Sequence, residues 1–224
     1  MFVMQKILMG SSVSPWAEIN KNRAFFMNFS KGQPLFDVSQ LSLMLREGAA
    51  ALFPTDTLPA LASIPERATQ LWKIKRRPTH KPLILMGSSA SELLQFAGSN
   101  SLEDAELMAS KYWPGALTMI LPSSGSIVDA LNPGGVNIGI RIPACEVAIE
   151  LLSKSGPLAT TSANIAGYPP TLNAEEATNC FPGLPLLGPL PWPNPSGLAS
   201  TVILWRSKGC WQVLRKGAVI VQEV

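Results

Sequence analysis

The sequence predicts an α/β domain built on an open, twisted, mixed sheet with flanking helices. Residues 136–142 alternate in character with a period of two, which is typical of a strand with one face against the core. Residues 66–77 instead place apolar side chains at helical spacing. The chain has 224 residues, 46% hydrophobic and 15% charged, which is enough to bury one substantial core and excludes a mainly disordered protein.

The first predicted helix lies between Ser39, which can cap it, and Gly48, which can end it. A short apolar run at 49–53 follows, and Pro54 stops it. Further helices are predicted at 66–77, 91–96, 102–112 and 144–152, and further strands at 82–86, 117–121, 136–142, 157–161, 200–205, 211–214 and 218–221.

Residues 1–34 show no orderly pattern, so we expect an irregular N-terminal extension and a folded domain at 35–224. No apolar run approaches the roughly 20 residues that a membrane-spanning helix needs. The apolar stretch at 7–10 is too short for a secretory signal.

The chain has few residues suited to metal binding or to histidine-based catalysis. Cys145, Cys180 and Cys210 are far apart and odd in number, which favours reduced thiols over a disulfide frame or a zinc site. His80 is the only histidine, which argues against a catalytic triad. We therefore expect a cytoplasmic protein whose site depends on other side chains.

Residues 73–82 are the densest cationic stretch, and no acidic residue lies between Glu66 and Glu92. The basic residues are Lys73, Lys75, Arg76, Arg77 and Lys81. The ordinary explanation is a solvated helix end, and the functional one is a bound anion. Because Pro78 favours an extended backbone at the residue before it, we expect Lys75 and Arg77 to point into a cleft and Arg76 to point away.

Short polar side chains follow two strand-like runs, at 54–57 and at 160–164. Each segment alone is compatible with a simple turn or a helix cap. Arg141 is less ordinary, because it shares a strand face with Asn137 and Gly139, and a buried guanidinium needs an anionic partner. Together these residues indicate a polar cleft for a phosphate-bearing small molecule. The charge-free, proline-rich segment 181–197 is expected to be an extended loop at its rim.

Six motifs in this order resemble the Sua5/YrdC/YciO family over about residues 35–221. They are Pro-Thr-Asp-Thr at 54–57, Lys-Arg-Arg-Pro at 75–78 with Lys-Pro-Leu at 81–83, Trp-Pro-Gly-Ala-Leu-Thr at 113–118, Ile-Arg-Ile-Pro at 140–143, Thr-Ser-Ala-Asn at 161–164 and Ser-Thr-Val-Ile at 200–203. The resemblance implies a YrdC-like sheet around a large, electropositive, concave cavity.

The resemblance also implies a threonylcarbamoyl-AMP synthase. Such an enzyme condenses L-threonine, bicarbonate or CO2, and ATP, with Mg2+, into threonylcarbamoyl-adenylate and pyrophosphate for the t6A37 modification of tRNA. By resemblance, Lys75 and Arg77 would be the catalytic pair that contacts the triphosphate. ATP would also contact Ser162, Asn164 and Ser200, and threonine would contact Thr55, Lys81, Thr118 and Arg141. Proteins that transfer the t6A group would be downstream partners.

The chain departs from the family pattern at three places, which leaves a second interpretation open. Leu58-Pro59-Ala60 stands where a hydrophobic residue and then Tyr-Gly are usual, and Ile165-Ala166-Gly167 lacks the usual Ser-Gly. Leu204 stands where an aspartate is usual. The alternative is a non-catalytic YrdC-like paralogue that binds RNA, including double-stranded RNA, or a nucleotide through the basic cavity.

Overall fold

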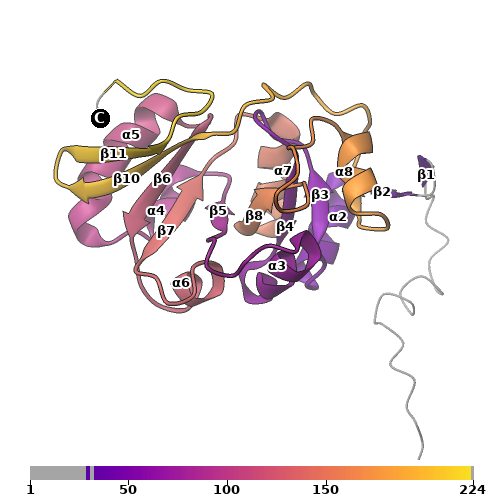
Figure 1. Ribbon diagram of the computed structural model, residues 1–224, viewed down its shortest axis with the longest axis horizontal. Coiled ribbons are helices and arrows are strands. Elements are labelled where there is room, and N and C mark those ends of the chain that lie inside the picture. Colours follow the sequence, from indigo (N-terminus) through magenta and orange to yellow (C-terminus); the bar gives the residue numbers. More distant parts are fainter. Residues whose placement is uncertain (1–28, 31–32, 223–224) are drawn as a thin grey trace, which may run out of the picture.

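The computed structural model describes residues 29–30 and 33–222. Its strands form one mixed sheet in the order β1-β2-β9-β3-β4-β8-β5-β7-β6-β10-β11, and Figure 1 shows helices on both sides of it. The strands are β1 Phe29–Ser30, β2 Gln33–Phe36, β3 Ala51–Phe53, β4 Ala60–Ser63, β5 Ile84–Met86, β6 Leu117–Pro122, β7 Asn137–Arg141, β8 Leu158–Ser162, β9 Leu186–Leu187, β10 Thr201–Ser207 and β11 Cys210–Arg215. The helices are α2 Val38–Arg46, α3 Thr69–Lys75, α4 Ala90–Leu94, α5 Leu102–Tyr112, α6 Ser126–Leu131, α7 Glu146–Ser155 and α8 Ala174–Cys180. The predicted α/β class with a mixed twisted sheet is confirmed.

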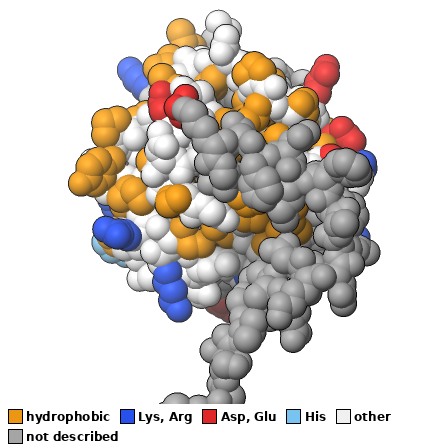
Figure 2. Space-filling model, turned by 90° about the vertical axis from the view of Figure 1, so that its right-hand side faces the viewer, with side chains coloured by type: hydrophobic (Ala, Val, Ile, Leu, Met, Phe, Trp, Pro, Cys, Tyr) orange, Lys and Arg blue, Asp and Glu red, His pale blue; other side chains and the backbone are white. Residues whose placement is uncertain are grey.

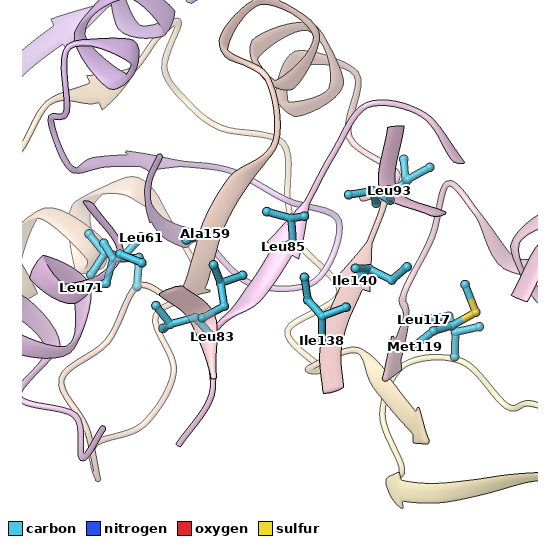
Figure 3. Close-up of a cluster of buried hydrophobic side chains, with 14 of the residues drawn as sticks. Leu61, Leu71, Leu83, Leu85, Leu93, Leu117, Met119, Ile138, Ile140 and Ala159 are labelled. Carbon is cyan, nitrogen blue, oxygen red and sulfur yellow. The ribbon is translucent and has the colours of Figure 1, made fainter. Parts of the chain in front are cut away.

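Alternate residues along the central strands separate two faces of the sheet. Leu85, Ile138 and Ile140 belong to the larger core, which Figure 3 shows with Leu61, Leu83 and Met119. Helices α3, α4, α5 and α6 contribute buried residues to this core and so cover the first face.

The second face is covered over only part of its area. Phe53, Ala62 and Met86 pack there against α2 and α7, which also contact each other. Residues of this same face on β4, β5, β7 and β8 line an open cavity. The site therefore lies on the part of the second sheet face that α2 and α7 leave uncovered.

The N-cap of helix α2 lies two residues earlier than the sequence predicts. Asp37, not Ser39, is the N-cap: its Oδ1 accepts from the Gln40 amide at 2.8 Å, and Gln40 Oε1 accepts from the Asp37 amide at 3.1 Å. This reciprocal pair satisfies two backbone donors that a helix start otherwise leaves free. Gly48 follows the helix with φ of +95°, as its predicted role requires.

Other element assignments need correction. The predicted strand at 218–221 is absent: the Ala218 amide donates to Ala199 O, and the Thr201 hydroxyl donates to Val219 O, so this segment is tied across the start of β10. The predicted helix at 66–77 is shorter, because a 3₁₀ turn at Pro65–Arg67 precedes α3. Three further elements, β4, α6 and α8, are not predicted by the sequence patterns.

The N-terminal and proline-rich segments also contain strands. In the predicted irregular extension, residues 29–30 and 33–34 are strand, whereas 1–28 lie outside the described residues. The segment 181–197 is mostly irregular, as predicted, but β9 within it joins the sheet between β2 and β3. Its far end does reach the site, because the Ser196 and Gly197 amides donate to Asp56 O and Thr57 O. Where Figure 2 leaves the end of the molecule that carries β2 and α8 visible, hydrophobic and uncharged side chains occupy most of the surface and charged ones lie toward its margin.

Within the described residues, no helix has the length and apolar character that crossing a membrane demands. Cys145 is buried, Cys180 is partly buried and Cys210 is exposed, and all three are free thiols.

Candidate functional site

The cavity on the second face of the sheet has a volume of about 280 Å³. Its charged lining residues are Arg77, Arg141 and Arg215. Hydroxyl and amide groups come from Thr57, Thr118, Asn132, Asn137, Thr160, Thr161, Ser162 and Ser200. The apolar lining residues are Leu58, Pro59, Ala60, Pro82, Leu83, Ile84, Met86, Ile120, Ala199 and Val202. Three arginines beside hydroxyl groups suit an anion that also has an apolar part.

Strand β7 forms the cavity floor. Asn137, Gly139 and Arg141 all line it, which confirms the strand face predicted from the period-two pattern. A Cβ at Gly139 would lie 3.0 Å from Ile84 Cγ2, closer than neighbouring atoms normally allow. Because Gly139 has no side chain, the space above the middle of β7, between Asn137 and Arg141, stays open.

Arg141 is buried in the cavity wall and has partners within the chain. Its Nη2 lies 2.5 Å from Asp56 Oδ1, its Nη1 donates to Thr57 Oγ1 at 2.7 Å and its Nε donates to Gly115 O at 2.9 Å. Burial lowers the pKa of Arg141, while the Asp56 carboxylate acts in the opposite direction. The anionic partner that the sequence requires is thus Asp56, and the guanidinium holds the loop at 54–57 against the sheet.

Lys75 lies behind the cavity wall, not in its lining. Its Nζ donates to Ser162 O, to Ser162 Oγ at 3.1 Å and to Asn164 Oδ1 at 2.8 Å. The residues Lys75, Ser162 and Asn164 are therefore brought together as expected, but only Ser162 among them lines the cavity. Lys75 therefore contacts the cavity lining at Ser162 without being part of it.

Arg76 and Arg77 lie as predicted, but for a different reason. Arg76 is exposed and Arg77 lines the cavity. The backbone does not become extended after Lys75: Arg76 has φ of +54° and ψ of +40°, the left-handed conformation that commonly ends a helix. This turn, and not strand-like alternation, directs Arg77 inward.

Arg77 and Arg215 are the other two charged residues of the cavity lining. Arg77 donates to Lys81 O at 3.2 Å and to Pro82 O at 3.1 Å, and Arg215 Nη2 donates to Ser200 O at 2.8 Å and to Ser200 Oγ at 3.2 Å. Burial lowers the pKa of both, and the charge of Arg215 lowers the pKa of Arg77 further. Sequence analysis did not identify Arg215, which stands at the end of β11 outside the six motifs.

The other predicted site residues divide into two groups. Thr118 and Ser200 are buried, line the cavity and share a hydrogen bond of 2.8 Å between their hydroxyl oxygens. Thr55 lies behind the lining, where its hydroxyl donates to Leu58 O at 2.7 Å and contacts Thr57 Oγ1 at 3.1 Å. Lys81 is exposed and lies outside the lining.

The described residues contain no cluster of three or more His, Cys, Asp or Glu side chains that could hold a metal ion. Asp56, the acidic side chain next to the cavity, is already paired with Arg141. A magnesium ion at this site would therefore depend on phosphate oxygens and water for most of its ligands, as is common for magnesium bound with nucleotides.

A model of the Sua5/YciO/YrdC family, described as telomere recombination, matches residues 43–217. The chain is 35% identical over 143 residues to a threonylcarbamoyl-AMP synthase of Pyrococcus abyssi, covering 62% of this chain and 42% of that protein. It is 34% identical over 154 residues to one of Bacillus subtilis, covering 65% of this chain and 43% of that protein. The chain thus spans less than half the length of these two relatives.

Solved structures show the same architecture. P. abyssi Sua5 complexed with L-threonine matches with a TM-score of 0.74 and 29% identity, covering 80% of this chain and 54% of that one. E. coli YciO shares the fold with a TM-score of 0.71 at 22% identity, covering 85% of this chain and 98% of that one. Since the family model spans most of the described domain, the resemblance seen in the six motifs is confirmed, and the chain belongs to the Sua5/YciO/YrdC family.

Proposed function

We propose that this protein is a threonylcarbamoyl-AMP synthase that joins L-threonine, bicarbonate or CO2, and ATP at the cavity on β7. The observation that carries the proposal is the convergence of Arg77, Arg141 and Arg215 with buried hydroxyl groups on one sheet face. Relatives that are 34–35% identical bear this name, and the P. abyssi Sua5 structure was determined with L-threonine. The product would serve the t6A37 modification of tRNA in the cytoplasm, with t6A-transfer proteins consuming it.

The reaction suits side chains that position and neutralise rather than strong acids or bases. The threonine amine adds to CO2 and loses a proton to give a carbamate. A carbamate oxygen then attacks the α-phosphorus of ATP, the bond from that phosphorus to the oxygen bridging the β-phosphate breaks, and pyrophosphate leaves. Arg77 and Arg215 are suited to the phosphate charge, because Asp56 already neutralises Arg141. Thr118, Ser162 and Ser200 offer hydroxyl groups that can orient the substrates. Magnesium, bound with ATP, would supply further charge neutralisation.

The decisive test supplies the purified full-length protein with L-threonine, bicarbonate, Mg2+ and ATP, and measures pyrophosphate and threonylcarbamoyl-adenylate. We expect both products, and neither without threonine. One observation favours the alternative: Pro59 and Ala60, two departures from the family pattern, lie in the cavity lining itself. Binding of ATP or RNA with no adenylate formed would therefore identify a non-catalytic paralogue.

Replacing Arg77 with alanine should weaken ATP binding by about 1–3 kcal/mol, the range for a lost charge-assisted hydrogen bond. Arg76→Ala is the matched control, since it removes the same charge from the neighbouring, exposed position. Titration calorimetry with ATP measures both variants. Equal losses at the two positions would show that a diffuse surface charge, and not the cavity, attracts the nucleotide.

A further inference from the structure

Lys75 is a buried cation without an acidic partner among the described residues. It is 2% exposed, and its Nζ donates to one carbonyl, one hydroxyl and one amide oxygen, all of them neutral. Burying an ammonium group is costly even when neutral oxygens accept its hydrogen bonds. When Lys75 is protonated, no acidic side chain among the described residues balances its charge.

Ser162 connects this charge to the cavity. Its hydroxyl accepts from Lys75 Nζ at 3.1 Å and donates to Asn164 Oδ1 at 2.7 Å, so the protonated lysine fixes the direction of the Ser162 proton. A neutral amine has a lone pair and can instead accept that proton. The Ala166 amide also donates to Lys75 O at 3.1 Å, which holds the turn after β8 against the end of α3.

We propose that Lys75 is a positioning residue that acts through Ser162, and that an anion enters the cavity together with a proton on Lys75. The inference rests on the proposed function only in taking ATP as the anion. The anion balances the buried ammonium charge, and the charged ammonium, by donating to the Ser162 hydroxyl, keeps the Ser162 proton directed at Asn164 Oδ1.

The charges around Lys75 support this coupling. Burial and, to a lesser extent, the positive charge of Arg77 lower its pKa to about 7, while Cys180 at the end of α8 acts in the opposite direction. An anion beside Ser162 raises the pKa again, because it favours the charged form. At a pH between about 7 and the raised pKa of Lys75 in the complex, binding of the anion takes up a proton. Affinity is therefore greatest below pH 7 and falls as the pH rises, by up to about tenfold per pH unit.

Titration calorimetry with ATP from pH 7 to 9, in buffers of different ionisation enthalpy, measures both the dissociation constant and the protons taken up. In the unmodified protein the dissociation constant should rise with pH, approaching about tenfold per pH unit, and ATP binding should take up close to one proton. Lys75→Arg, which stays charged, and Lys75→Met, which is never charged, should each abolish this slope. Lys73→Met, at an exposed position of the same helix, should retain it. Thermal unfolding of each variant verifies that it is folded.

The outcomes separate this inference from the proposed function. A proton still taken up by Lys75→Arg or Lys75→Met, or ATP affinity in the unmodified protein that does not change with pH, would overturn the role of Lys75. Normal proton-linked binding with no adenylate product would overturn the synthase activity and leave Lys75 as assigned. Failure to bind ATP at every pH would overturn both.

Discussion

Replacing Asp56 with alanine should lower the free energy of unfolding by about 3–5 kcal/mol, the range for breaking a buried ion pair. The substitution leaves the Arg141 guanidinium in the cavity wall with only Thr57 Oγ1 and Gly115 O as partners. The side chain of Arg141 is 3% exposed and that of Asp56 is 16% exposed, so the charge left behind is largely shielded from water. Urea unfolding monitored by tryptophan fluorescence measures the loss.

Glu150→Ala is the matched control, because it breaks the ion pair with Lys154 on the surface of α7. Exposed pairs of this kind contribute about 1 kcal/mol or less. Removing both charges with Asp56→Ala and Arg141→Met should recover much of the stability, since no unpaired charge then remains buried. If Asp56→Ala costs no more than Glu150→Ala, Arg141 is not held by this carboxylate, and the loop at 54–57 has another anchor.

The sequence predicted β7 and its inward face well because the signal is local. Asn137, Gly139 and Arg141 alternate with Ile138 and Ile140, and any register of that strand places all three on one side. It also predicted that Arg141 needs an anion. It did not reveal that Asp56, 85 residues earlier, is that anion, because the pairing depends on how the loop after β3 arches over the sheet.

Other features escaped because their signals depend on tertiary context. Strand β4 follows directly on Pro59, and its four residues, Ala60–Ser63, lack a period-two pattern since all four are buried. In the sequence, nothing distinguishes Arg215 from the other cations near it. Only the pairing of β10 with β11 places it beside Ser200. Lys75 was correctly associated with Ser162 and Asn164, but burial behind Ser162 cannot be read from the motif.

Replacing Phe53 with alanine should lower the free energy of unfolding by about 3–5 kcal/mol, which is typical when a buried phenylalanine is truncated. Phe53 is the last residue of β3 and is fully buried under α2 and α7, in the core cluster that contains Leu41 and Leu151. The cavity left there cannot close easily, because the packed helices on one side and the hydrogen-bonded strand on the other both resist movement. Urea unfolding measures the change.

The effect of Phe53→Ala should be on stability and not on the chemistry of the site. Its side chain is not part of the cavity lining, although the strand that it anchors leads into the loop that carries Thr57. In the folded variant we therefore expect ATP affinity near that of the unmodified protein. Leu107→Ala, on the exposed side of α5, is the control and should cost less than about 0.5 kcal/mol. A loss at Phe53 as small as that at Leu107 would mean that α2 and α7 do not pack on β3, and the cover of the second sheet face would have to be assigned differently.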